Sequence, residues 1–335
     1  MTELLKNLCN LDGISGDEGA VRDFIISEIK DYCEYKTDNL GNIIAFKKGK
    51  NKPFKKILLD AHMDEVGLII THITDSGFLK FKALGIETES LMQRAVKING
   101  KIKGIISGKP VHLLSGDEAK KLPKADSLYI DIGAKSKEVA EKYVAIGDSA
   151  VICGENKEQG GKIISKALDD RIGCALLINL IRNFEEYDFY ASFSVQEEIG
   201  LRGAKVASFA VNPDCAIILE GTTAADIADV PEDKTVCRLG CGPAVSFMDK
   251  ATSYDKIFYR SALESGIKCQ SKASVTGGNN AGAIHLSREG VRSVVISVPC
   301  RYIHTASSVA DISDMENALK LAEFMLKGIA SGEIK

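Results

Sequence analysis

The chain has 335 residues, of which 45% are hydrophobic and 27% are charged, the balance of an ordinary globular protein. Lys and Arg number 43 and Asp and Glu number 46, so the formal net charge is −3. A nonspecific nucleic-acid binder needs a net basic surface, and no apolar stretch approaches the roughly 18–20 residues that span a bilayer. We therefore expect neither a nucleic-acid partner nor a membrane partner.

The N-terminal residues and the cysteines indicate a cytoplasmic protein. The segment 1–6 has no basic region followed by an apolar stretch, so no signal peptide is predicted there. Nine cysteines are scattered from Cys9 to Cys300 without a CxxC pair. An odd number of scattered thiols is typical of free cysteines in a reducing compartment.

The first predicted elements are a helix and two strands. Ser15 followed three residues later by Glu18 is a capping-box signal, and apolar residues then recur at helical spacing up to Ile29. Residues 42–47 and 56–61 have the composition of strands. The second of these contains an unbroken apolar run, which is typical of a strand that is covered on both faces.

The middle of the chain has a different pattern. From about residue 66, short strand-like pieces are separated by glycine and charged turns. This pattern predicts a small barrel or sandwich, with one helix at 136–143.

Helices and strands alternate again from about residue 166. The predicted elements are a helix around 177–184, strands at 189–195, 215–219 and 293–298, and a closing helix at 313–328. Such alternation predicts an α/β layered sheet with helices on both sides. We therefore expect a discontinuous main domain of residues 1–65 plus 162–335, and an inserted β-rich domain of residues 66–161.

Acidic and histidine residues recur next to these predicted elements. They are His62 with Asp64, Asp169 with Asp170, Glu197 with Glu198, Glu220, and His304. Each group alone is more often structural, since an Asp at a helix start is commonly an N-cap and paired acids are usually solvated. However, at least four of the five groups follow a predicted strand or begin a helix. Such positions converge on one edge of a parallel sheet, where α/β proteins bind ligands.

Taken together, two imidazoles and three carboxylates suit Zn²⁺, Co²⁺ or Mn²⁺. A ligating imidazole usually donates its second ring nitrogen to a carboxylate, and Asp64 is suitably close to His62. One carboxylate can bridge two metal ions, and the remaining one of Glu197 and Glu198 is free to act as a general base. Spacing alone does not decide between Asp169 and its neighbour Asp170 as the bridge.

The ordered segments 60–67, 167–173, 196–200 and 302–305 resemble the motifs of the glutamyl and tetrahedral aminopeptidases. These are dinuclear metallopeptidases, some of which were formerly labelled endoglucanases. The resemblance covers nearly the whole chain. It implies a zinc-peptidase-like α/β/α layered sheet with an inserted small β-barrel domain that serves oligomerisation and access control.

The resemblance also assigns roles to residues. It implies two divalent metal ions, with zinc the first expectation and cobalt or manganese as alternatives. The implied metal ligands are His62, Asp169, Glu198, Glu220 and His304. His62 and Glu220 would hold one ion, Glu198 and His304 the other, and Asp169 would bridge them.

The implied reaction is the removal of N-terminal residues from short peptides by a metal-activated water. Glu197 matches the family's general base, and Asp64 matches the acid behind the first histidine. The family also implies a homo-oligomer, often a tetrahedral dodecamer.

The chain departs from the family pattern in three places, one of which is the segment 84–87. Glu220 stands where some relatives have Asp, and Asn279-Asn280 stand where relatives often have Thr-Asp. Three alternatives remain: a dinuclear-metal deacylase acting on N-acyl amino acids, a metal-independent glycosidase that uses Glu197 and Glu198, and a noncatalytic scaffold.

Overall fold

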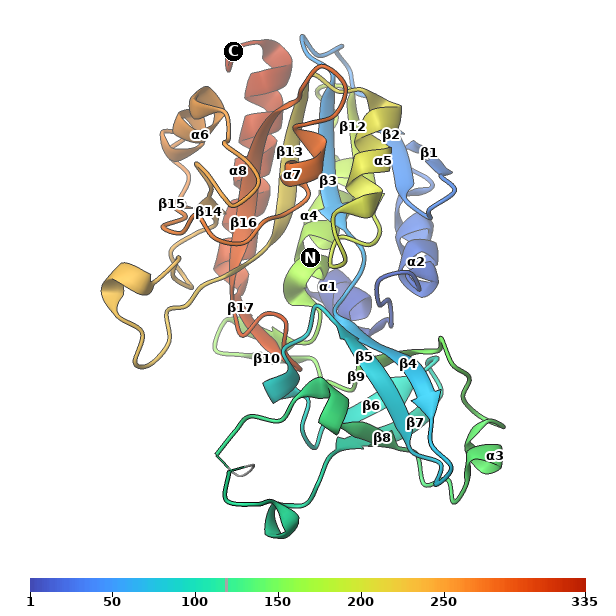
Figure 1. Ribbon diagram of the computed structural model, residues 1–335. Coiled ribbons are helices and arrows are strands. Elements are labelled where there is room, and N and C mark those ends of the chain that lie inside the picture. The colour runs from blue at the N-terminus through green and yellow to red at the C-terminus, as the bar shows by residue number, and fades with distance from the viewer. Residues whose placement is uncertain (118–119) are drawn as a thin grey trace.

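The structure is a computed structural model that describes residues 1–117 and 120–335 (Figure 1). The described residues form one 11-stranded sheet and one closed six-stranded barrel, and Figure 1 shows the barrel beneath the sheet. This architecture confirms the predicted α/β layered fold with a small β-barrel. Among the described residues, no helix combines the length and the apolar character needed to cross a bilayer.

The large sheet is mixed, with a parallel centre. Its main path runs β1-β2-β12-β3-β13-β16-β17-β11-β10, and β14 and β15 extend from β16. The neighbouring strands β12, β3, β13 and β16 are parallel, whereas β2 and β17 pair antiparallel on either side. The strands are β1 (Glu34–Thr37), β2 (Ile43–Lys47), β3 (Ile57–His62), β10 (Lys157–Gln159), β11 (Lys162–Ser165), β12 (Phe189–Ser194), β13 (Cys215–Thr223), β14 (Ala244–Val245), β15 (Gln270–Ser271), β16 (Arg292–Arg301) and β17 (Ser308–Asp311).

Helices cover both faces of this sheet, as the unbroken apolar strands predict. Successive side chains of a strand point to opposite faces. Ile57 and Leu59 of β3 accordingly pack in one cluster with helices α1, α2, α4 and α8, whereas Leu58 packs in another with α5 and α7. The helices are α1 (Thr2–Asn10), α2 (Gly19–Ile29), α4 (Leu168–Asn183), α5 (Arg202–Val211), α6 (Lys256–Leu263), α7 (Ala281–Ile284) and α8 (Ile312–Ser331).

The barrel has its own core. Its strands close in the order β4-β5-β8-β7-β6-β9 around buried residues such as Leu68, Val96 and Ile130. Closure pairs every strand edge, which settles the earlier choice between barrel and sandwich. The elements here are β4 (Gly67–Ile73), β5 (Leu79–Leu84), β6 (Ala95–Ile98), β7 (Ile102–Ser107), β8 (Tyr129–Asp131), α3 (Lys137–Ala140) and β9 (Ser149–Ile152). Short 3₁₀ helices lie at Thr88–Ser90, Val111–Leu113, Ala125–Ser127 and, outside the barrel, Glu232–Lys234.

The division into residues 1–65 plus 162–335 and 66–161 stays a prediction. The barrel strands run from Gly67 to Ile152, and β10 pairs with β11 in the large sheet.

The predicted capping box is wrong. Helix α2 starts at Gly19, with Glu18 as its N-cap and no side-chain capping bond. The Ser15 hydroxyl instead donates to Asp64, and the Glu18 carboxylate accepts from the backbone of Gly16 and Gln196. Both side chains therefore form hydrogen bonds elsewhere instead of capping the start of the helix.

Candidate metal centre

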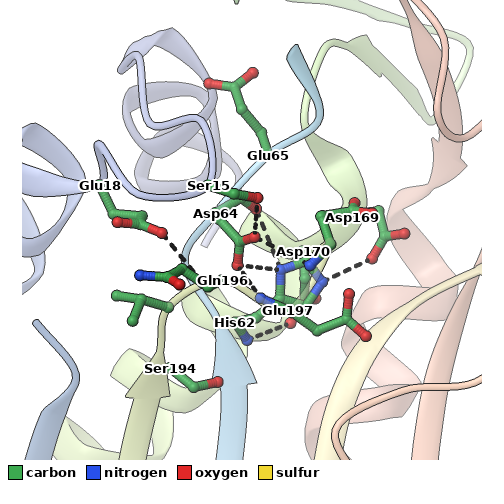
Figure 2. Close-up of polar contacts among 12 residues, drawn as sticks. Ser15, Glu18, His62, Asp64, Glu65, Asp169, Asp170, Ser194, Gln196 and Glu197 are labelled. Atoms are coloured by element: carbon green, nitrogen blue, oxygen red, sulfur yellow. Dashed lines mark hydrogen bonds and ion pairs between the residues drawn. The ribbon is translucent and has the colours of Figure 1, made fainter. Parts of the chain in front are cut away.

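His62 ends β3, and its two ring nitrogens face different carboxylates (Figure 2). Nδ1 lies 3.3 Å from Oδ1 of Asp64, and Nε2 lies 3.4 Å from Oδ1 of Asp169. Burial lowers the pKa of His62, but the hydrogen bonds to both carboxylates outweigh burial and raise that pKa well above its usual value. Ligating histidines are commonly oriented in this way, with one nitrogen free for a metal and the other facing a carboxylate.

Asp64 connects the end of β3 to the loop that follows β12. Its carboxylate accepts hydrogen bonds from the backbone N–H groups of Glu197 (2.9 Å) and Glu198 (3.1 Å) and from the Ser15 hydroxyl (2.6 Å). Burial raises the pKa of Asp64, but His62 and these hydrogen bonds hold it below its usual range. Asp64 is thus an ionised group that fixes the position of both glutamates.

Asp169 lies between the two imidazoles. Its Oδ1 faces His62, and its Oδ2 lies 3.6 Å from Nε2 of His304. Burial raises the pKa of Asp169, but the hydrogen bonds to the imidazoles hold it well below its usual range. Asp170 turns away, because its carboxylate accepts from the backbone N–H groups of His62 (3.1 Å) and Gly173 (2.8 Å). The structure therefore distinguishes Asp169, which faces both imidazoles, from Asp170, which does not, whereas sequence spacing alone could not.

The remaining candidates are brought together by the loops after β12 and β16. Nε2 of His304 lies 3.5 Å from Oε2 of Glu198. Two overlapping groups of donor atoms each fit within 4.8 Å: one has His62, Glu197 and Glu198, and the other has Asp169, Glu198 and His304. Either group could hold a metal ion, and the two share Glu198.

Glu220 lies farther from these groups. The predicted strand ends at Leu219, but β13 continues to Thr223, so Glu220 sits inside the strand. It lines a cavity of about 340 Å³ together with His62, Asp169, Glu197 and His304, but it belongs to neither group of donor atoms. Burial raises the pKa of Glu220 well above its usual value.

The chemistry of this set fits divalent cations. Imidazole nitrogens and carboxylate oxygens are ligands of Zn²⁺ and of Co²⁺ or Mn²⁺. Burial raises the pKa of Glu197 to about 7 and also raises the pKa of Glu198, which means that ionising these neighbouring carboxylates without a cation is unfavourable. Because like charges in a shared site oppose ionisation, a cation of charge +2 would stabilise the ionised form of the cluster.

The Asn279-Asn280 departure lies beside the site rather than in it. The Asn280 side chain is buried and donates hydrogen bonds to Oδ2 of Asp60 (2.7 Å) and to the Ser194 hydroxyl (2.8 Å). Burial raises the pKa of Asp60 to about 6. An amide at position 280 suits this neighbour, since a second carboxylate there would face Asp60 and disfavour its ionised form.

Sequence reasoning missed several residues that surround the site. Ser15 and Glu18 gave only a helix-start signal, although they bond to Asp64 and to the backbone of Gln196. Lys272 lines the cavity from a segment without a recognised motif. Long-range contacts of this kind leave no local pattern in the chain.

The fold and the cluster together define an α/β protein with a candidate metal site at the carboxyl edge of its sheet. Residues 41–321 match the M42 glutamyl aminopeptidase family, and the chain belongs to that family. The family resemblance seen in the sequence is therefore confirmed.

Two relatives and two solved structures illustrate the match. A protein of Acetivibrio thermocellus is 40% identical, covering 96% of this chain and 97% of its own length. The lysyl aminopeptidase of Pyrococcus furiosus is 34% identical, and the match covers 97% of this chain and 96% of the relative's length. An aminopeptidase of the archaeon Desulfurococcus kamchatkensis superposes with a TM-score of 0.92 at 34% identity, over 100% of this chain and 97% of that one. The TET1 peptidase of Pyrococcus horikoshii superposes with a TM-score of 0.85 at 33% identity, over 96% of this chain and 98% of that one. That peptidase can assemble into a tetrahedron or a large octahedral shell.

Proposed function

We propose that this protein is a metal-dependent aminopeptidase that removes N-terminal residues from short peptides. The observation that carries the proposal is the Asp169 carboxylate, which offers one oxygen to His62 and the other to His304 beside the cavity. A carboxylate in this position can bridge two divalent cations. Membership of the M42 family supports peptide hydrolysis and does not favour the deacylase alternative.

The proposed ligands are His62, Asp169, Glu198, Glu220 and His304, with zinc as the first candidate metal. When bound, the cations supply a water molecule that ionises near neutral pH and a Lewis acid for the scissile carbonyl. Asp64 keeps the His62 ring in place and holds the backbone that carries Glu197.

Glu197 is the proposed general base. Its carboxylate lines the cavity, and within the described chain it has no ion-pair partner within 4.0 Å. It would accept a proton from the attacking water as oxygen adds to the carbonyl carbon. It would then deliver that proton to the leaving amine nitrogen as the C–N bond breaks.

A substrate panel combined with metal removal tests this function. We expect the purified protein to contain a divalent metal, to hydrolyse aminoacyl-p-nitroanilides, and to lose that activity on dialysis against 1,10-phenanthroline. Added Zn²⁺, Co²⁺ or Mn²⁺ should restore it, because the proposed mechanism requires a cation. Activity confined to N-acyl amino acids would favour the deacylase instead, and activity that survives complete metal removal would overturn the proposal.

We also propose that the protein is a homo-oligomer, on the model of the tetrahedral shell formed by the TET1 peptidase. Multi-angle light scattering should give a mass several times the 36.1 kDa of one chain, and twelve times that mass for a dodecamer. A single species of about 36 kDa at micromolar concentration would exclude the assembly.

A further inference from the structure

The backbone of the loop that follows β12 is held by side chains from distant parts of the chain. Four consecutive N–H groups each donate to a side-chain oxygen: that of Val195 to Asn42 (2.9 Å), that of Gln196 to Glu18 (3.1 Å), and those of Glu197 and Glu198 to Asp64 (2.9 and 3.1 Å). The acceptors lie between 133 and 178 positions away along the chain. The position of this loop therefore depends on side chains that belong to neither β12 nor the loop itself.

Gln196 is the residue of this loop whose backbone most needs support. Its φ is 57°, in the left-handed region that residues other than glycine rarely adopt. A conformation of this kind persists only where the surrounding structure holds it. Glu197 follows directly, and its carboxylate lines the cavity. A change in the backbone at Gln196 would therefore turn the Glu197 side chain to a different direction.

Glu18 provides the support at the Gln196 N–H. The residue is buried, and its Oε1 accepts from the N–H groups of Gly16 (2.7 Å) and Gln196 (3.1 Å). Figure 2 shows the Glu18 side chain reaching toward Gln196, with Asp64 close to the same loop. Hydrogen bonds from N–H groups to a carboxylate are stronger than those between neutral groups. One carboxylate oxygen therefore connects the turn before α2 to the loop after β12.

The segment that carries Glu18 is itself anchored on both sides. The Ser15 hydroxyl donates to Asp64 (2.6 Å). The Asp17 carboxylate accepts from the hydroxyl of Ser149, in barrel strand β9 (2.5 Å). Because these contacts fix the backbone before Glu18, its carboxylate is held at a defined place.

A purely local role for Glu18 is the alternative. Glu18 is the N-cap residue of α2, and its contact with Gly16 closes a turn two residues long. A local role would be complete with that contact. It does not account for the second bond, which reaches Gln196 across 178 positions of sequence.

We infer that Glu18 is a positioning residue for Glu197 and acts through the backbone of Gln196. Asp64 holds the N–H of Glu197 itself, and Glu18 holds the N–H of the residue before it. Two adjacent peptide groups together define the direction from which Glu197 accepts and delivers a proton. The inference rests on the proposed function, because it takes Glu197 as the general base.

Backbone hydrogen exchange of the purified protein tests the first part without any need for activity. In peptides that cover residues 195–201, Glu18→Ala should speed exchange roughly 10-fold or more, the scale of a lost hydrogen bond to a charged group. Glu18→Gln should keep exchange near the wild-type rate. Both N–H groups donate to the same oxygen, so the amide oxygen of glutamine can accept both.

Steady-state kinetics on an aminoacyl-p-nitroanilide tests the second part. Glu18→Ala should lower kcat roughly 10- to 100-fold and leave KM within about 3-fold, because a slightly misplaced base weakens the transition state more than substrate binding. Glu18→Gln should restore most of the lost kcat.

Asp314→Ala is the matched control. Asp314 is also buried, and its carboxylate also accepts two backbone N–H groups, those of Gly240 (2.7 Å) and Gly242 (2.6 Å). Within the described chain it does not line the cavity. The control should lose stability in urea and keep a kcat near that of the wild type.

Several outcomes would overturn the inference. Unchanged exchange at 195–201 in Glu18→Ala would show that Glu18 does not hold the loop. Faster exchange with an unchanged kcat would leave the positioning of Glu197 to Asp64 alone. A higher KM without a lower kcat would assign Glu18 to substrate binding, and an equal loss of kcat in Asp314→Ala would reduce its role to general stability.

Two further results are distinguishable from these. If Glu18→Ala does not fold, Glu18→Asp takes its place, since it keeps the charge on a shorter side chain, and a wild-type kcat in that variant would contradict the inference. If metal-loaded wild type cleaves no anilide, the proposed function fails. The exchange measurement then shows separately whether Glu18 holds the loop.

Discussion

Glu197→Gln is expected to lower kcat by roughly 10²–10⁴-fold, the usual contribution of a general acid–base group. Glutamine keeps the size of the side chain but cannot accept the proton of the attacking water. The local geometry should survive, since Asp64 holds residue 197 through its backbone N–H rather than its side chain. Steady-state kinetics on an aminoacyl-p-nitroanilide measures kcat, and elemental analysis of the same preparation measures its metal content.

Glu198→Gln is the matched control for this experiment. It makes the same chemical change at the next residue, whose carboxylate faces His304 and belongs to both groups of donor atoms. We expect Glu197→Gln to retain its metal and Glu198→Gln to lose part of it. Near-normal turnover in Glu197→Gln would remove that residue from its proposed role, and loss of metal in that variant would make it a ligand instead.

The central strands and the clustering of the candidate site residues could be predicted because their signals are local. The apolar run at the start of β3 marks a strand covered on both faces, and His62 is the last residue of that strand. In a parallel sheet the carboxyl ends of the strands share one edge. Residues placed after several such strands therefore meet even when far apart in sequence, as His62 and His304 do around Asp169.

Other features depend on contacts that no local pattern encodes. The orientation of Asp169 and Asp170 is settled by the backbone groups that Asp170 reaches, not by their spacing. The capping-box motif at Ser15 is present, but a buried carboxylate 49 positions away competes successfully for its hydroxyl.

Glu65, the residue after Asp64, is hydrogen-bonded to residues that lie far from it in the sequence. The Glu65 carboxylate accepts from Lys166 Nζ (2.6 and 2.7 Å), from Arg171 Nη2 (3.4 Å) and from the Gly13 N–H (3.1 Å). Arg171 is fully buried and also donates to the Leu8 carbonyl (2.6 Å). A Cβ at position 13 would lie 2.6 Å from Cγ2 of Val21 and 2.8 Å from Nη2 of Arg171, so a larger residue there would force these side chains to move. The ion pair thus fastens the N-terminal segment to the strand end and to the start of α4.

Glu65→Ala is therefore expected to lower the free energy of unfolding by about 3–5 kcal/mol, because it leaves Lys166 and Arg171 buried without their carboxylate. Urea denaturation at matched protein concentration measures the change. The control is Glu185→Ala, which breaks a pair with Lys50 whose side chains are 62% and 72% exposed, and exposed pairs contribute about 0–1 kcal/mol. Similar losses in the two variants would mean that burial does not set the strength of the Glu65 network. A large loss in Glu65→Ala alone would show that the buried pairs of Glu65 with Lys166 and Arg171 stabilise the fold next to Asp64 and His62.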